Sequence, residues 1–260
     1  MSFGTRRSFY GRRRSWSRRG RGMTARRVAR IAKSVSLRQA ETKRSVVPND
    51  KAAFGPLASG AQAFFSIKNV FSQIGLGSDF NQLEGNELVN TRARCTGTLF
   101  VNWSDVFTLT GVVQPVVFYV TLIAVNQQIT DSPIFVPFPS GTVPNLLQEF
   151  DINRLTWEGQ TVTVVKQFKR QMNPPNLTGG ELESSTRHGT MNFDVSAVLK
   201  GKKRYQISSP STTAATQLVW LKGYQFYWTV IAGYGTRSPT AEVTPPFDVI
   251  CDHYLYFKDP

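Results

Sequence analysis

The pattern of hydrophobic and polar positions changes near residue 61. Beyond it, runs of β-branched and aromatic residues are separated by Gly, Pro, Asn and Ser, and several runs alternate between apolar and polar positions. Alternation with a period of two is typical of strands whose two faces meet different surroundings. The strands predicted in this way are 62–71, 91–103, 115–126, 151–157, 160–170, 189–199, 203–208, 216–221, 224–233 and 247–258.

Helical periodicity is rare after residue 45, and only residues 143–150 (VPNLLQEF) suggest a short helix. The connections between the predicted strands are long, and two-residue Asn-Gly hairpins are missing. Long connections favour a Greek-key arrangement over a simple meander. Because no internal repeat is present, a propeller is not expected. The sequence therefore predicts an all-β fold, a single Greek-key jelly-roll β-sandwich of about eight main strands.

Residues 23–40 (MTARRVARIAKSVSLRQA) follow a different period. Val28, Ile31, Ala32 and Val35 are spaced as i, i+3, i+4 and i+7, and Thr24 precedes them as the expected N-cap. The remaining positions are mostly basic or small. This pattern predicts a short basic helix with an apolar stripe, which is only marginally stable by itself.

The excess positive charge is confined to the first sixth of the chain. Residues 1–44 contain thirteen arginines, two lysines and one acid, Glu41, which accounts for the whole formal net charge of +14. Residues 45–260 contain sixteen basic and sixteen acidic residues. The sequence therefore predicts three parts: a basic N-terminal arm (1–44), a linker (45–60) and a neutral β-domain (61–260).

Residues 1–22 (MSFGTRRSFYGRRRSWSRRGRG) are rich in Arg, Ser and Gly. Such dense like charge predicts disorder in isolation and order gained by neutralising phosphates. Each contact releases a counterion, so the binding is salt-sensitive and independent of base sequence. Aromatic residues between the cations can stack on unpaired bases, which favours single-stranded nucleic acid. The predicted nucleic-acid-binding residues are Arg6, Arg7, Arg12, Arg13, Arg14, Arg18, Arg19, Arg21, Arg26, Arg27, Arg30, Lys33, Tyr10 and Trp16.

The contiguous clusters Arg12-Arg13-Arg14 and Arg18-Arg19 also fit a nuclear-import signal that import receptors would read. A solubilising tail and attraction to an acidic membrane surface are alternative uses of the same charge. The first thirty residues hold no apolar segment of the kind a secretory signal requires. The longest apolar run, Val116–Val125, is about half the length of a bilayer span, so no membrane span is expected.

No catalytic motif is present: the G-x-S-x-G, H-E-x-x-H and P-loop patterns are all missing. Cys95 and Cys251 are far apart in the sequence and form no C-x-x-C pair, and His188 and His253 are the only histidines. Asp252-His253 is interpreted as a strand end rather than as part of a catalytic triad. We therefore expect free thiols, no metal, no cofactor and no enzymatic activity.

Three polar features of the β-domain have weaker functional interpretations. Residues 200–204 (KGKKR) are a solvated turn or a polyanion contact. Arg92 and Arg94 share one face of a strand, which can turn toward nucleic acid. Glu181 and Glu183 are a solvated loop pair or a divalent-cation site at a subunit contact. Apolar subunit contacts, or alternatively core anchors, are expected at Trp103, Pro133–Pro139 and Pro245–Phe247.

Three segments carry a resemblance to a known family. They are the Arg-rich opening 1–22, the stretch Gly85–Trp103 (GNELVNTRARCTGTLFVNW) with the apolar strand 115–126, and the ending 253–260 (HYLYFKDP). They resemble capsid proteins of circovirus-like, Rep-encoding viruses with circular single-stranded DNA genomes. The resemblance implies a single jelly roll that self-assembles into a T=1 icosahedral shell. It also implies an inward arm that packages the DNA, entry into the host nucleus before assembly, and a final location in the virion.

Three other classes of protein remain open. The Arg-rich bias is shared by coat proteins of small RNA viruses. A non-viral nucleic-acid-binding protein with a β-domain is a second alternative, and it predicts a basic surface on that domain. A jelly-roll enzyme or carbohydrate-binding protein with a basic localisation tail is the third, and it requires a set of polar or aromatic residues in one loop cluster.

Overall fold

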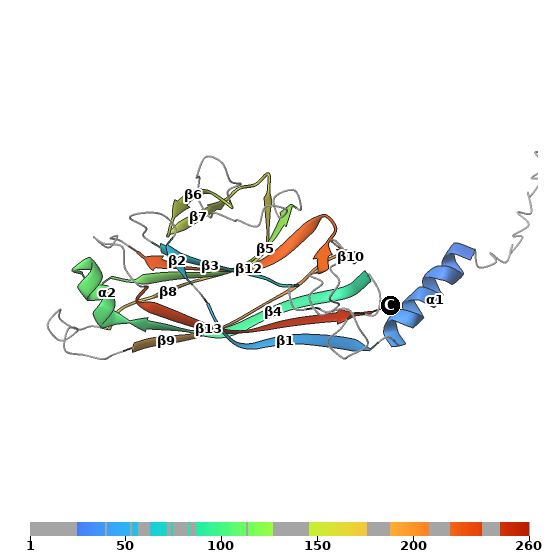
Figure 1. Ribbon diagram of the computed structural model, residues 1–260, viewed down its shortest axis with the longest axis horizontal. Helices are drawn as coiled ribbons and strands as arrows, with labels where there is room; N and C mark the ends of the chain where they lie inside the picture. The colour runs from blue at the N-terminus through green and yellow to red at the C-terminus, as the bar shows by residue number, and fades with distance from the viewer. Residues whose placement is uncertain are drawn as a thin grey trace, which may run out of the picture. The chain divides into compact units, whose positions relative to one another are not determined.

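The computed structural model describes residues 25–39, 41–52, 54–56, 63–71, 74, 83, 87–112, 114–126, 146–175, 188–207, 219–235 and 245–259. The chain forms two compact units, residues 1–39 and 40–260. In the first unit, helix α1 (Ala25–Gln39) occupies the stretch whose periodicity predicts a helix. The second unit contains all the described strands and a second helix, α2 (Trp103–Thr110) (Figure 1).

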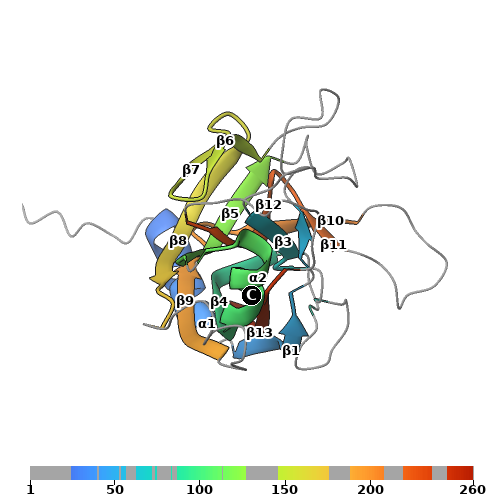
Figure 2. The ribbon, with the colours of Figure 1, turned by 90° about the vertical axis from the view of Figure 1, so that its left-hand side faces the viewer.

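Two antiparallel sheets face each other in the second unit (Figures 1 and 2). The strands of the first sheet are β1 (Thr42–Lys51), β4 (Glu87–Asn102), β9 (His188–Val198), β10 (Lys203–Ile207), β11 (Val219–Leu221) and β13 (Phe247–Lys258). The strands of the second sheet are β2 (Gly55–Pro56), β3 (Ala63–Asn69), β5 (Val116–Asn126), β8 (Val162–Met172) and β12 (Tyr224–Tyr234). Strands β6 (Leu147–Asp151) and β7 (Arg154–Trp157) form a separate hairpin.

The order of the main strands identifies the topology. Four strands form the body of each layer, in the orders β1-β13-β4-β9 and β3-β12-β5-β8. Along the chain, β1 to β3, β3 to β4, β4 to β5, β8 to β9 and β12 to β13 each cross from one layer to the other. Such wrapping of Greek keys around two sheets is a jelly roll. The predicted all-β Greek-key sandwich with about eight main strands is therefore confirmed.

The main core lies between the two layers. Inner positions of β4, such as Ala93, Cys95 and Leu99, are fully buried, and they alternate with outward-facing polar positions. Trp228 and Phe118 contribute large, fully buried side chains from the opposite layer. Burying each large apolar side chain stabilises the fold by roughly 1.5–3 kcal/mol, so this layer contact is the main source of the unit's stability.

A second cluster covers the outer face of the second sheet. Tyr119 and Ile123 of β5 pack there with Leu146, Leu147 and other side chains of the hairpin region, and the Tyr119 hydroxyl donates a hydrogen bond to the Ile152 carbonyl at 2.8 Å. Strands β5 and β12 are therefore buried on both faces. Burial on both faces explains why residues 116–125 are a continuous apolar run instead of an alternating one.

Two predicted boundaries are wrong. Residues 42–51 are strand β1, which pairs with β13 from Thr42 opposite Lys258 onward, whereas the sequence predicts the arm to extend to residue 44 and a linker over 45–60. Pro48 and Asn49 hid the strand, because they interrupt its alternation. They lie in a register shift between Val47 and Asp50, where Asn49 has a φ of 51°. The end of the first unit at residue 39 agrees with this assignment.

The structure also corrects the helix assignment at two places, one predicted helix that is a strand and one helix that was not predicted. The described part of 143–150 is strand β6 rather than a helix, because Leu147 is buried in the second cluster. Helix α2, which the sequence analysis does not predict, follows directly after β4. The Asn102 side chain accepts a hydrogen bond from the Ser104 amide at its start, and Gly111 ends the helix with a φ of 67°.

Trp103 is only 4% exposed, so it is a core anchor and not a surface contact. Within the described ranges, no helix is long and apolar enough to cross a membrane.

Close packing around Gly97 yields a stability test. A Cβ atom at Gly97 would collide with the Ile250 carbonyl of β13 and lie 2.7 Å from the Phe193 ring. We expect Gly97→Ala to lower the free energy of unfolding by about 1–3 kcal/mol through overpacking. Gly159→Ala is the matched control, because nothing lies within 4 Å of its Cβ position. Urea denaturation of both variants measures the difference, and equal midpoints would contradict the pairing of Gly97 with Cys251.

Candidate nucleic-acid interface

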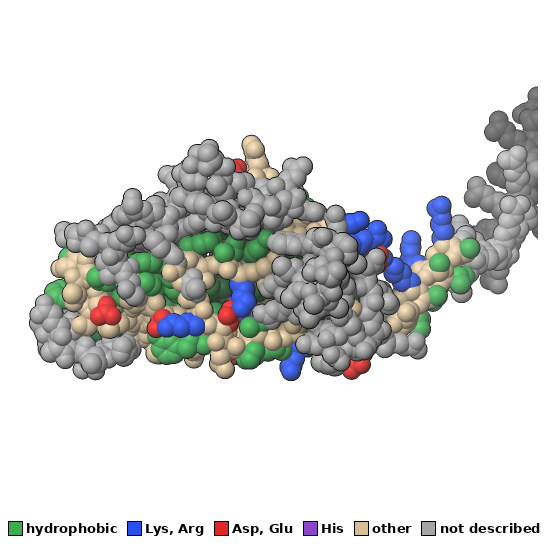
Figure 3. All heavy atoms as spheres, viewed as in Figure 1, with side chains coloured by type: hydrophobic (Ala, Val, Ile, Leu, Met, Phe, Trp, Pro, Cys, Tyr) green, Lys and Arg blue, Asp and Glu red, His purple; other side chains and the backbone are tan. Residues whose placement is uncertain are grey.

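Helix α1 has two opposite faces. At 100° per residue, Arg26, Arg30 and Lys33 fall on one side and the apolar stripe on the other. Val28, Ile31 and Val35 of that stripe are 44–49% exposed. Lys and Arg side chains and hydrophobic side chains both stand along the helix in Figure 3. The helix therefore offers one continuous cationic face, as its sequence predicts.

The charges of α1 work against the helix in the absence of an anion. Its first turn contains no acid, and Arg26 and Arg27 stand beside the positive end of the helix dipole. Arg26 and Arg30 are four residues apart, a spacing at which like charges repel. Phosphates bound along this face would remove both penalties. The arrangement suits a helix that forms fully on a polyanion.

The other predicted residues of the arm are not described by the structure. Thr24 and the aromatic candidates Tyr10 and Trp16 lie outside the described residues. The predicted cations outside them are Arg6, Arg7, Arg12, Arg13, Arg14, Arg18, Arg19 and Arg21. Their roles in binding nucleic acid and in nuclear import stay predictions.

The outer face of the first sheet carries a second group of candidate residues. Register places Arg44 of β1 opposite Tyr256 of β13, and Tyr256 opposite Arg92 of β4. One step along, Tyr254 is opposite Arg94. Paired residues share a face of a sheet, so the two arginines of β4 lie on one face, as predicted. The structure adds the two tyrosines between the cations, which sequence reasoning missed.

The tyrosines form a flat aromatic pair. The rings of Tyr254 and Tyr256 are 6.3 Å apart between centroids and 9° from parallel. Arg94 lies over Tyr254, with its guanidinium carbon 5.9 Å from the ring centroid. Parallel rings together with a guanidinium group are a surface on which unpaired bases can stack. In the sequence, the signal for this pair is the alternation of tyrosine with other residues in the ending HYLYF.

One arginine of this face, however, is already paired with a carboxylate. Arg94 binds Asp194 through two hydrogen bonds of 2.9 and 2.6 Å, and these bonds hold the pKa of Asp194 below its usual value. Arg92 donates to the Ser196 hydroxyl at 3.0 Å instead. Arg94 is therefore already matched by a carboxylate. The face can stack bases, and its attraction for phosphates is left to Arg44 and Arg92.

Two cations of the cluster 200–204 share one acid. Glu87 accepts hydrogen bonds from Lys202 at 2.6 Å and from Arg204 at 2.8 Å, and these bonds lower the pKa of Glu87. Lys203 lies over the Phe226 ring at 5.0 Å, and burial lowers its pKa. Of the two interpretations of this cluster, the pairing of Lys202 and Arg204 with Glu87 favours a solvated turn over a polyanion contact.

The remaining sequence candidates divide into two groups. Pro246 and Phe247 are buried, so they anchor the core rather than offer a subunit contact. Pro133–Pro139, Glu181 and Glu183 lie outside the described residues, so their interpretations stay predictions.

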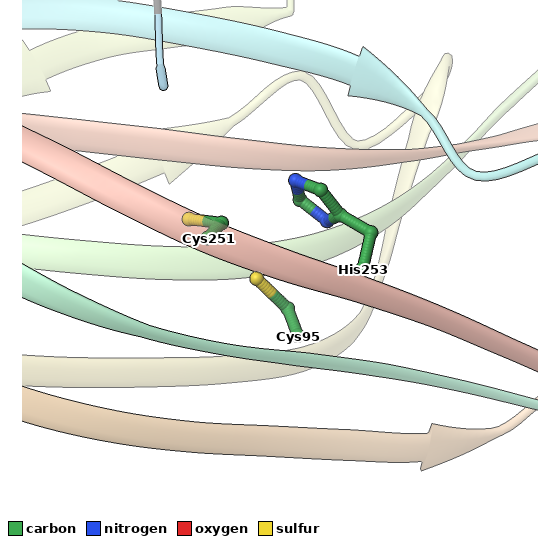
Figure 4. Close-up of side chains that lie close together, drawn as sticks. All are labelled: Cys95, Cys251 and His253. Carbon is green, nitrogen blue, oxygen red and sulfur yellow. The ribbon is translucent and has the colours of Figure 1, made fainter. Parts of the chain in front are cut away.

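His253 is not at a strand end, as the sequence interpretation had it, but within β13 on its inner face. Its Nε2 atom lies 3.3 Å from Asp50 Oδ2, and Asp50 also binds Lys68. Burial and the nearby Lys68 lower the pKa of His253 to about 4. The structure places both cysteines next to it, although they are far apart in the sequence (Figure 4).

No protein-family model matches the chain, and no curated protein matches it.

The cationic face of α1 yields a binding test. We expect the triple variant Arg26→Gln, Arg30→Gln, Lys33→Gln to bind a single-stranded oligonucleotide with a weaker dependence on salt. The slope of log K against log salt should be smaller in magnitude by about 2, because three counterions are no longer released. Lys222→Gln is a matched control, since it removes an exposed cation from the second unit. Fluorescence anisotropy across a salt series measures both slopes. An unchanged slope in the triple variant would remove α1 from the interface.

Proposed function

We propose that this chain is a viral capsid protein that self-assembles into a small icosahedral shell and packages a single-stranded DNA genome through its Arg-rich arm. The observation that carries the proposal is the joining of a jelly-roll sandwich to a segment that holds all of the excess charge. The chain would enter the host nucleus through the clusters of its arm, assemble there, and end in the virion.

The difference in charge between the arm and the β-domain supports this proposal. Residues 45–260 have no net charge, and three cations that the structure describes on the first sheet and near β10, Arg94, Lys202 and Arg204, are paired with the carboxylates of Asp194 and Glu87. A shell wall needs neutral surfaces that can meet other copies without repulsion. An arm that binds nucleic acid needs dense charge and no base preference.

The amount of charge suits packaging. Each copy contributes +14, so about sixty copies would bring roughly 840 positive charges to the interior. This charge neutralises a substantial part of a genome of about one to a few kilobases, and the rest is left to small counterions. A single-stranded genome also exposes unpaired bases to the aromatic residues of the arm.

The main alternatives make different predictions. A non-viral nucleic-acid-binding protein is expected to have a basic surface on its β-domain, and the ion pairs of Arg94 and of Glu87 count against one. A coat protein of a small RNA virus shares the arm and the fold. Digestion of the packaged nucleic acid with DNase or RNase after disruption of the particles separates the two kinds of genome.

Removal of residues 1–39 tests the proposal. The truncation eliminates thirteen positive charges and leaves β1 intact. We expect it to abolish nucleic-acid binding at physiological salt, because counterion release is lost, while the β-sandwich still folds and associates with other copies. Filter binding and analytical ultracentrifugation provide the two readouts.

A charge-preserving variant is the matched control for this truncation. Changing the eight arginines between residues 6 and 21 to lysine keeps the charge, so binding should persist. If the truncated chain still bound nucleic acid tightly at physiological salt, the proposed roles of arm and body would be wrong.

A further inference from the structure

Three potential metal ligands meet on the inner face of the first sheet. Cys95 lies on β4, and Cys251 and His253 lie on β13, where His253 is paired with Cys95 and Cys251 with Gly97. One ligand atom from each of the three residues lies within 4.8 Å of the other two. Figure 4 shows the three side chains close together, with Cys95 on β4 and with Cys251 and His253 on β13. The antiparallel register brings together cysteines that 155 intervening positions separate in the sequence.

The imidazole of His253 has one nitrogen engaged and one without a partner. Its Nε2 lies 3.3 Å from Asp50 Oδ2, so the Nε2–H group donates to the carboxylate. Its Nδ1 is buried and has no hydrogen-bond partner among the described residues. A buried polar atom without a partner is costly. In metal sites, the histidine ligand commonly donates its second N–H to a carboxylate, which fixes the ring and frees the other nitrogen.

We propose that Cys95, Cys251 and His253 form a buried binding site for Zn²⁺, with Asp50 as the residue that orients the imidazole. Two sulfur ligands and one nitrogen ligand suit Zn²⁺, whereas Mg²⁺ and Ca²⁺ require oxygen ligands. The fourth position of the tetrahedron is left to water or to a small exogenous ligand.

The spacing and charge of the cluster fit this ion. With Zn–S and Zn–N bonds of about 2.3 and 2.0 Å, neighbouring ligand atoms are roughly 3.5–3.8 Å apart in a tetrahedron. The ligand atoms lie within 4.8 Å of one another, so they need to approach by at most about 1.3 Å to reach these distances, which small side-chain rotations supply. Zn²⁺ with two thiolates is neutral, and the adjacent Asp50–Lys68 pair is neutral too, so no uncompensated charge is buried.

A disulfide is the competing use of the two cysteines. Cys95 and Cys251 are diagonal neighbours across β4 and β13, since each faces a different residue in the register. Diagonal positions in a sheet are about 7–8 Å apart, whereas the Cα atoms joined by a disulfide are usually about 4.4–6.8 Å apart. Both cysteines are free thiols in the structure. The unpartnered Nδ1 beside them has no role in a disulfide.

Zinc bound here would join β4 to β13 beside the strand that follows the arm. Binding replaces the two thiol protons, which are released to solvent, so the two sulfurs bind as thiolates and no redox step is involved. Because the native state alone assembles the three ligands, zinc stabilises the folded chain by mass action.

The test uses the full-length chain, freed of nucleic acid with nuclease and high salt and kept reduced. After removal of metal with a chelator, Zn²⁺ is titrated by calorimetry, and Co²⁺ is added separately to reveal thiolate coordination through its charge-transfer absorption. We expect one ion per chain, a Co²⁺–thiolate band, and a rise in Tm of about 5 °C at zinc concentrations well above Kd.

The variants separate this site from other metal-binding groups. Cys95→Ala, Cys251→Ala and His253→Gln are each expected to abolish the one-equivalent binding, and His188→Gln, the control, should retain it. If a variant fails to fold, the Co²⁺ band of the unmodified chain decides. Absence of that band, unaltered binding in the cysteine variants, or a Cys95–Cys251 disulfide in the protein as isolated would overturn the proposal.

Discussion

The insertion of β13 between β1 and β4 is the constraint on which the rest of the sandwich depends. This last strand pairs along its length with β4 on one side and with β1, the strand that follows the arm in the sequence, on the other. Its outward positions carry the stacked tyrosines, and its inward positions carry Cys251, His253 and core residues such as Phe257. Because side chains alternate in a strand, one register positions both faces at once.

Separation of charge is the second organising principle. Nearly all of the excess positive charge precedes the sandwich in the chain, and several cations of the sandwich are paired with carboxylates such as Asp194 and Glu87. Paired surface charges add little stability, but a cation that is paired with a carboxylate attracts phosphates less strongly. Nucleic-acid binding can therefore change with the arm while the sandwich keeps its packing.

Sequence patterns predicted the elements whose signal is local, and they missed those that depend on distant partners. The run Val116–Val125 predicts a buried strand by itself. Strand β1 escaped prediction because Asn49 lies in a bulge that only its pairing with β13 stabilises. The sequence around Leu147 suggests a helix, but Leu147 is buried against the second sheet and belongs to strand β6. The contact of Cys95 with His253 arises from strand register, which no spacing in the sequence encodes.

Electron microscopy of the assembled protein tests the proposed capsid function most directly. The full-length chain is expressed, treated with nuclease at low salt, and its high-mass fraction is imaged in negative stain. A capsid protein is expected to form closed particles of uniform diameter that protect single-stranded nucleic acid from digestion. A monodisperse monomer or small oligomer whose nucleic acid is fully digested would contradict that function.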